Sequence, residues 1–251
     1  MNDIKLTLEE AFGGIVFDET PHKYYDDHHT EYTSVTTFVG QQSQPFDARA
    51  VAARKTSSAE DMNKLLAQWE YNKNYSCTLG TELHKVCENL WQRKMYKPVA
   101  PAGFDGMQAD LDRRAIQCSS AVDSLRADGY APIATEFVVG DRLLGIAGCI
   151  DTLLYNTKTG RFCIEDNKTN KQIRFKGFKG AMMKDRFSEF PDCEYGHYTC
   201  QLNIYADLIE RNTDIKVDEL FLIHFPPNGE PWKKIAIERK PIFKSQEELN
   251  V

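Results

Sequence analysis

Two stretches of the chain, Gly148-Cys149-Ile150-Asp151 and Ile164-Glu165-Asp166-Asn167-Lys168-Thr169, decide the fold that the sequence predicts. Each stretch belongs to an apolar run that contains acidic side chains, and short segments rich in Gly, Asp, Asn and Thr separate the runs. Such turn residues between apolar runs are typical of antiparallel hairpins. We therefore expect an antiparallel β-meander, with strands near residues 133–139, 143–154 and 161–166.

The segments on either side of this meander add helices and further strands. A hairpin is expected over residues 14–25, and residues 34–39 form either a short strand or the start of a helix. An alanine- and charge-rich composition predicts a helix over 45–70, and the spacing of apolar residues predicts helices over 80–94 and 198–211. A further helix is expected over 107–128, and two final strands over 220–225 and 234–238. This order predicts an α/β (α+β) fold, in which a central mixed β-sheet with an antiparallel meander is flanked by helices.

The length of 251 residues suits one domain with a substantial core. We expect a single domain over residues 1–251. It consists of an N-terminal β-hairpin region over 1–45, a helical region over 46–130 and, over 131–251, the sheet core that carries the acidic residues.

Composition narrows the classes of protein that fit. With 41% hydrophobic and 27% charged residues and no apolar run of about 18 residues, the chain reads as a soluble globular protein without a membrane partner. Its N-terminus lacks a signal peptide, so a cytoplasmic location is expected. The 7 cysteines include no C-x-x-C pair, which argues against a structural zinc cluster or a disulfide framework. A metabolic enzyme lacks support, because the chain has no dinucleotide, P-loop or nucleophile-elbow motif.

Asp151, Asp166 and Lys168 form the candidate reactive centre. Side chains alternate along a strand, so Asp166 and Lys168 point the same way, and hairpin pairing can bring Asp151 beside them. Two carboxylates at one place repel each other unless a cation lies between them, which favours Mg²⁺ or Mn²⁺. The alternative interpretation is ordinary surface charge at the end of a hairpin.

Further polar residues accompany this centre along the chain. His84 lies near the start of a predicted helix, and Glu136 lies in the strand before Asp151. Gln201 and Tyr205 are four residues apart on a predicted helix and share one face. A single histidine on an apolar helix is otherwise a satisfied core residue.

These motifs, taken in order, resemble the RecB-like branch of the PD-(D/E)XK nucleases, and especially the family of the mitochondrial genome maintenance exonuclease and related phage exonucleases. The resemblance spans residues 22–210. It rests on Ser34-Val35-Thr36, Gly80-Thr81-x-x-His84, Glu136, Gly148-x-x-Asp151, Asp166-Asn167-Lys168-Thr169 and Gln201-x-x-x-Tyr205. It implies a restriction-endonuclease-like core and a Mg²⁺- or Mn²⁺-dependent deoxyribonuclease that hydrolyses phosphodiester bonds.

The resemblance also implies roles for single residues. His84, Asp151 and Asp166 would ligate the metal, with the carbonyl of Asn167 as a further ligand, and Lys168 would be the catalytic lysine. Glu136 would hold a second metal or a water, Gln201 and Tyr205 would position the lysine or the DNA backbone, and Ser34 and Thr36 would contact a phosphate. A histidine ligand suits Mn²⁺ better than Mg²⁺.

The chain departs from the family pattern beside the second acid. Glu165 precedes Asp166, so the family's acid could be shifted by one residue, but strand alternation turns Glu165 away from Lys168 and favours Asp166. Asn167 stands where the family has an apolar residue, and its polar side chain needs a hydrogen-bond partner if it is buried.

A basic segment follows Lys168, although the net charge of the chain is −6. Lysine and arginine interleaved with aromatic residues are typical of single-stranded DNA binding, which combines phosphate neutralisation with base stacking. We therefore expect a mobile loop that guides a DNA strand, unless the segment is a disordered connector. The residues concerned are Lys171, Arg174, Phe175, Lys176, Phe178 and Lys179.

These observations favour a metal-dependent DNA exonuclease that acts on single-stranded ends. DNA replication, recombination or processing of the phage type would be its setting, with replication or recombination proteins as possible partners. Two alternatives stay open: an endonuclease, and a catalytically inactive DNA-binding or inhibitor protein with the same fold.

Overall fold

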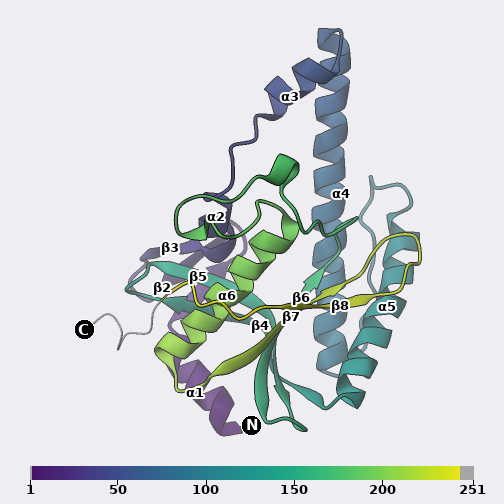
Figure 1. Ribbon diagram of the computed structural model, residues 1–251. Coiled ribbons are helices and arrows are strands. Elements are labelled where there is room, and N and C mark those ends of the chain that lie inside the picture. The colour runs from purple at the N-terminus through teal and green to yellow at the C-terminus, as the bar shows by residue number, and fades with distance from the viewer. Residues whose placement is uncertain (1, 244–251) are drawn as a thin grey trace.

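Eight strands form one mixed sheet in the computed structural model, which describes residues 2–243 (Figure 1). Their order across the sheet is β1-β2-β3-β5-β6-β7-β8, and β4 pairs with β5. The strands are β1 (Ile15–Asp18), β2 (Lys23–Asp26), β3 (Glu31–Ser34), β4 (Tyr130–Asp141), β5 (Ile146–Asn156), β6 (Arg161–Lys168), β7 (Val217–His224) and β8 (Lys233–Ile237).

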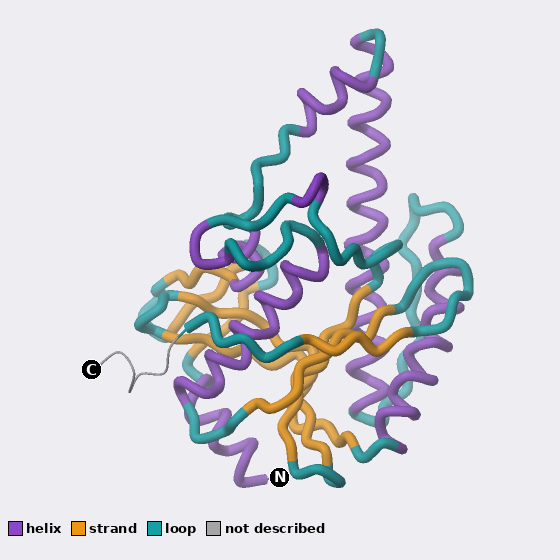
Figure 2. The backbone as a smooth tube through the Cα atoms, in the orientation of Figure 1, coloured by secondary structure: helices purple, strands orange, loops and turns teal. Residues whose placement is uncertain are grey.

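The helices lie on both faces of this sheet, and Figure 2 shows the helices and strands as separate layers. They are α1 (Asn2–Phe12), α2 (Val35–Gly40), α3 (Ala48–Lys55), α4 (Ala59–Trp91), α5 (Met107–Ala127) and α6 (Glu194–Asn212), with short 3₁₀ turns η1 (Phe178–Gly180) and η2 (Asp185–Phe187). The predicted α/β fold with a mixed sheet flanked by helices is confirmed. Among the described residues, no helix is both long and apolar enough to cross a membrane.

The predicted antiparallel meander is present but forms only part of the sheet, most of which is not a meander. β4, β5 and β6 pair antiparallel in sequence, as the turn residues between them indicated. However, β3 pairs with β5 and β6 pairs with β7 in parallel. Parallel neighbours need long crossover connections, and here helices make those connections: α6 joins β6 to β7.

Two apolar cores hold the layers together. On one face, α1, α2 and α6 pack against the sheet through buried residues such as Phe12, Val35 and Leu202. On the other face, α4 and α5 pack through Leu83, Trp91 and other buried residues. The sheet between them is therefore covered on both sides, which explains its apolar strands.

The helical region differs from the sequence-based prediction. Separate helices over 45–70 and 80–94 were expected, because Gly80 resembles a break. Instead α4 runs unbroken for 33 residues, and Figure 1 shows its first half projecting beyond the sheet with α3 beside it. A glycine inside a helix costs only about 1 kcal/mol relative to alanine. At Gly80 it leaves room for the chain after β6, since a Cβ there would lie 3.5 Å from Oγ1 of Thr169.

The N-terminal region contains the predicted hairpin, formed by β1 and β2. It also contains α1, which the sequence did not predict. Leu8 and Phe12 of this helix are each 1% exposed and join the core on the α6 face. Two buried side chains in eleven residues leave too short an apolar pattern to mark a helix by periodicity.

A buried arginine joins the ends of β6 and β7. Arg114 of α5 is 3% exposed, and its Nη1 donates to the carbonyl oxygens of Thr169 at 2.8 Å and Phe225 at 3.0 Å. Its other nitrogens form two hydrogen bonds with the carboxylate of Asp110. The N–H of Phe225 in turn donates to the carbonyl of Lys168, so Arg114 fixes the backbone directly behind that lysine.

Substitution of Arg114 tests whether its hydrogen bonds hold the ends of β6 and β7 together. Arg114→Met leaves the carbonyls of Thr169 and Phe225 and the carboxylate of Asp110 without this donor, so we expect the free energy of unfolding to fall by about 3–5 kcal/mol in urea titrations. Arg113→Met is the matched control, because the Arg113 side chain is exposed and its Nη1 lies as far as 4.0 Å from Oδ1 of Asp110, which makes a weak ion pair. This variant should change stability by less than about 0.5 kcal/mol. Equal losses in both variants would contradict the role of Arg114.

Candidate functional site

The candidate site lies where two neighbouring strands of the sheet separate. β5 and β6 pair as far as Thr152 and Glu165, and β6 then continues beside β7 alone. β4 takes one edge of β5 along its whole length, and β3 pairs with the start of the other edge. Within residues 2–243, no strand pairs with residues 148–151 on that second edge. Asp151 and Asp166 are the first residues beyond the last β5–β6 pair.

Beyond the last β5–β6 pair, the carboxylate of Asp151 binds a backbone N–H of β6 in place of a backbone carbonyl of β5. Its Oδ2 accepts a hydrogen bond of 2.7 Å from the backbone N–H of Asn167. Asp151 is 9% exposed, so this charge-assisted bond is largely shielded from bulk water. The bond ties β6 to β5 beyond their last pair and fixes the position of the carboxylate.

His84 of α4 reaches the same point from the helical layer. Its Nε2 lies 3.0 Å from the carbonyl oxygen of Asn167. A carbonyl can only accept, so Nε2 carries the hydrogen. The other ring nitrogen, Nδ1, faces Asp151 Oδ2 at 3.5 Å and Glu136 Oε1 at 3.7 Å. Metal-ligating histidines are commonly oriented in this way, with their second N–H bound to a carbonyl.

Glu136 of β4 completes a group of three possible ligands. It lies opposite Asp151 in the β4–β5 register, and its φ of 45° is left-handed, which costs a non-glycine residue about 1–2 kcal/mol. One ligand atom each from His84, Glu136 and Asp151 lies within 4.8 Å of the others. We call these residues the His–Glu–Asp group. An imidazole and two carboxylates form a donor set that fits a divalent cation such as Mn²⁺.

The two carboxylates of the His–Glu–Asp group act on its histidine. Burial lowers the pKa of His84, but the charge of Asp151 and the hydrogen bond with Glu136 raise it to about 9. At neutral pH the protonated ring therefore balances the carboxylates. A metal ion that binds at Nδ1 would displace this proton.

Asp166 forms a second, deeper centre with Lys168. Asp166 is 1% exposed, and its Oδ2 lies 2.5 Å from Nζ of Lys168. Its Oδ1 accepts a hydrogen bond of 3.4 Å from Nε2 of Gln201 on α6. The Lys168 ammonium also lies 4.6 Å from the centre of the Tyr198 ring, a cation–π contact. The lysine is thus held by a carboxylate and an aromatic face.

The charges of this pair shift both of their pKa values. Burial raises the pKa of Asp166, Lys168 opposes this, and the charge of Asp151 adds to it, so the pKa rises to about 6. Burial lowers the pKa of Lys168, but Asp166 and Asp151 outweigh it and the pKa rises above its ordinary value. Asp166 and Asp151 are the next residues beyond the last β5–β6 pair, which places the Asp166–Lys168 pair next to the His–Glu–Asp group.

Glu165 points to the opposite face of β6, as strand alternation predicted. It is 1% exposed and accepts a hydrogen bond of 2.9 Å from Nε1 of Trp91 on α4. Burial and the charge of Asp151 raise the pKa of Glu165 to about 8. Asn167 is buried on the same face, and a hydrogen bond with its side chain lowers the pKa of Glu165. Glu165 is therefore part of the α4 interface.

The residues implied as metal ligands occupy two places. His84 and Asp151 lie together and are joined by Glu136, whereas Asp166 lies outside the His–Glu–Asp group and binds Lys168. The carbonyl of Asn167 accepts from His84.

Gly148 and Tyr205 are in direct contact. A Cβ at Gly148 would lie 2.6 Å from Cε1 of Tyr205 and 3.1 Å from its hydroxyl. That hydroxyl accepts a hydrogen bond of 3.2 Å from Gln201, which in turn donates to Asp166. The glycine before Asp151 therefore leaves space for the tyrosine that supports the Asp166 centre.

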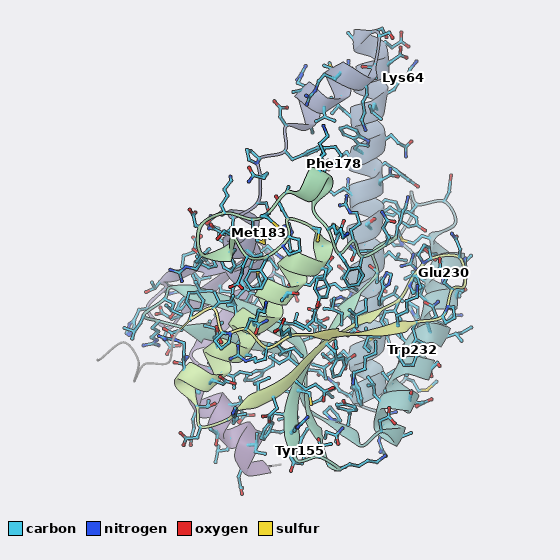
Figure 3. The ribbon with its side chains drawn as sticks, in the orientation of Figure 1. Lys64, Tyr155, Phe178, Met183, Glu230 and Trp232 are labelled. Carbon is cyan, nitrogen blue, oxygen red and sulfur yellow. The ribbon has the colours of Figure 1, made fainter. Side chains whose placement is uncertain are left out.

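The basic segment after β6 is anchored at several points and exposed between them. Lys171, Lys176 and Lys179 are exposed, as are the rings of Phe175 and Phe178, which are 55% and 76% exposed. Figure 3 labels Phe178 at the outermost turn of this segment, in the upper part of the view. Arg174 instead forms an ion pair with Glu194, and Phe175 packs on Tyr195. Buried side chains fix the rest of the segment, namely Ile173, Met183, Phe187 and Phe190.

Ser34 and Thr36 lie at the start of α2. The hydroxyl of Ser34 accepts a hydrogen bond of 3.1 Å from the N–H of Thr37, so it caps the helix, and Thr36 is exposed.

Three residues at the site escaped the sequence analysis. Tyr198 precedes Gln201 by three residues and so shares its helix face, a signal that could have identified it. Trp91 and Arg114 give no local signal, because their roles depend on contacts with β6 and the chain after it.

Comparisons with known proteins returned no relative: no family model and no curated protein matches this chain. We therefore infer its function from the arrangement of these side chains.

Substitution of Gly148 tests the link between the two centres. Gly148→Ala places a methyl group against the buried ring of Tyr205, so we expect stability to fall by about 1–3 kcal/mol, measured by urea unfolding. Gly40→Ala is the control, because a Cβ there meets nothing within 4 Å; it should be neutral or stabilise by up to about 1 kcal/mol. A Gly148→Ala protein as stable as the wild type would disprove the close approach.

Proposed function

We propose that this protein is a metal-dependent DNA nuclease with the restriction-endonuclease-like core of the PD-(D/E)XK superfamily. One observation carries the proposal: the ion pair between the buried Asp166 and Lys168 lies beside the His–Glu–Asp group, at the point where β5 and β6 separate. Acidic side chains with a lysine two residues after the second acid supply the groups that phosphodiester hydrolysis requires.

His84, Glu136 and Asp151 would hold Mg²⁺ or Mn²⁺, with Asp166 at the border of the site. Such an ion polarises a phosphodiester, makes a water more acidic and offsets charge on the leaving oxygen. The histidine favours Mn²⁺, since Mg²⁺ prefers oxygen ligands. His84 is kept in place by the carbonyl of Asn167, so its Nδ1 faces Asp151 and Glu136 and would be available as a ligand.

Lys168 would bind the reacting phosphate. Its raised pKa keeps the side chain protonated at neutral pH, so it offers a positive charge and hydrogen-bond donors. Asp166 and the Tyr198 ring hold its Nζ, which limits the rotamers that substrate binding must freeze. Orienting the attacking water and balancing phosphate charge are the roles that suit a protonated lysine.

The substrate would be a DNA strand with a free end. Lys171, Lys176 and Lys179 are exposed in the segment that leaves Lys168, and they suit contacts with phosphates. The exposed rings of Phe175 and Phe178 suit stacking on unpaired bases. We therefore propose cleavage from single-stranded ends.

Cleavage assays with site variants test the catalytic part of this proposal. Lys168→Ala and Asp166→Asn should each lower the rate of DNA cleavage with Mn²⁺ by about 10²–10³-fold or more, because each removes a group that stabilises charge in the transition state. Binding of single-stranded DNA, measured by fluorescence anisotropy, should persist in both.

Glu165→Gln is the matched control. Glu165 neighbours Asp166 but faces Trp91, and its pKa of about 8 leaves it mostly uncharged at pH 7, so glutamine mimics it closely. This variant should keep at least about half of the wild-type rate, within the small effect expected away from reacting groups. A protein that binds DNA equally well in all variants and never cleaves it would be the inactive binder.

End dependence is tested by comparing linear and circular substrates. With Mn²⁺, end-labelled linear single-stranded DNA should be degraded, circular single-stranded DNA should survive, and EDTA should abolish cleavage. Cleavage of the circle would identify an endonuclease. Failure to cut any nucleic acid with Mn²⁺ would contradict the proposed function.

A further inference from the structure

Asn170, the residue after Thr169, joins two further elements to the end of β6. Its backbone carbonyl oxygen lies 2.8 Å from Nε2 of His224, a residue that is 5% exposed and ends β7. A carbonyl oxygen can only accept, so Nε2 carries the hydrogen of this bond. The side-chain oxygen of Asn170, Oδ1, accepts a hydrogen bond of 2.8 Å from the hydroxyl of Tyr198 on α6. Asn170 is therefore fixed to β7 by its backbone and holds a helix side chain by its amide.

The hydroxyl of Tyr198 is the end of its side chain farthest from the helix backbone. Tyr198 is only partly buried, so packing does not enclose its ring completely. A second attachment at the hydroxyl fixes both the direction of the side chain and the tilt of the ring. That ring faces Nζ of Lys168 at 4.6 Å, and the attraction depends on the ammonium lying over the ring face. The bond with Asn170 therefore sets where the ring attracts the lysine.

The ammonium of Lys168 needs contacts from more than one side to be fixed. Its flexible stem of four carbons can place Nζ at many points. The ion pair with Asp166, a residue of the same strand, holds Nζ toward β6 alone. The Tyr198 ring adds a contact from α6, so Nζ is fixed between the sheet and a helix. A ring that loses its attachment at Asn170 weakens the second of these contacts.

We propose that Asn170 is a positioning residue for Lys168, which acts by holding the hydroxyl of Tyr198. This inference rests on the proposed function for the role of Lys168 at the reacting phosphate. An amide suits the task, because it accepts the hydrogen bond without adding a negative charge that would compete with the phosphate for the ammonium. Asn170 also directly precedes the exposed Lys171, so the basic segment begins at the residue that fixes the lysine.

A double-mutant cycle with Tyr198→Phe and Asn170→Ala tests the proposal. Phenylalanine keeps the ring and loses only the hydroxyl, and Asn170→Ala keeps the backbone bond with His224. Each single change should lower kcat for cleavage of single-stranded DNA with Mn²⁺ by about tenfold, with KM changed less than about twofold, because a displaced reacting group slows the step without weakening binding. The double variant should be no slower than the slower single variant, since both changes remove the same bond.

The position of Lys168 is measured without cleavage by NMR of protein that carries ¹³C-labelled lysine. Protons over the face of an aromatic ring resonate upfield, so the ε-methylene protons of Lys168, assigned by their loss in Lys168→Arg, should lie upfield of those of exposed lysines. This upfield shift should shrink to the same extent in Asn170→Ala and Tyr198→Phe and vanish in Tyr198→Leu. Unchanged signals from the other lysines show that each variant is folded.

Tyr96→Phe is the matched control, because it removes a hydroxyl that donates a hydrogen bond of 2.7 Å to Glu82 in the loop after α4. It should keep the wild-type kcat and the upfield shift of Lys168. An unchanged shift in Asn170→Ala, or rate losses that multiply in the double variant, would overturn the proposal. A protein that shows the shift and its decrease but never cuts DNA would refute the nuclease and leave the placement of Lys168 by Asn170 standing.

Discussion

The hydrogen bond from the N–H of Asn167 to the carboxylate of Asp151 is the interaction on which the site depends. It forms where β5 and β6 stop pairing, so a side chain satisfies a backbone group that a strand would otherwise satisfy. The bond holds the two strands close enough for Asp151 to influence Asp166 and Lys168. The backbone carbonyl of the same residue, Asn167, accepts a hydrogen bond from the imidazole of His84 and so orients that ring at the same place. One residue of β6 thereby positions side chains from two layers, Asp151 of the sheet and His84 of α4.

Helices on both faces of the sheet contribute side chains that hold the end of the β5–β6 pairing in place. On the α4 side, Trp91 binds Glu165, and Arg114 holds the backbone after Lys168. On the α6 side, Gln201 and Tyr198 hold Asp166 and Lys168. Burying this many charged groups is costly, and each is offset by a partner of opposite charge or a hydrogen bond. The site is therefore part of the core.

The sequence predicted those parts that depend on local patterns. Turn residues located β4, β5 and β6, and strand alternation separated Asp166 from Glu165 correctly. It did not predict the parallel neighbours of β5 and β6, because these depend on where helical connections return the chain. Nor did it show that Glu136, with its left-handed φ, joins His84 and Asp151 while Asp166 turns to Lys168. Asp166 and the His–Glu–Asp group occupy two places because β5 and β6 separate at this point. The spacing of motifs along the sequence does not indicate where two strands separate.

The continuity of α4 has a mechanical consequence. Its first half projects beyond the sheet beside α3, while its second half carries His84 and Trp91 into the protein (Figure 1). At about 1.5 Å per residue the helix is about 50 Å long, and such a rod bends little. The half of α4 outside the sheet and the half that carries His84 are one continuous helix, so a displacement of the outer end is transmitted along the helix toward the imidazole. Load on a distant surface therefore reaches the side chain of His84 through one continuous helix, without an intervening loop to absorb it.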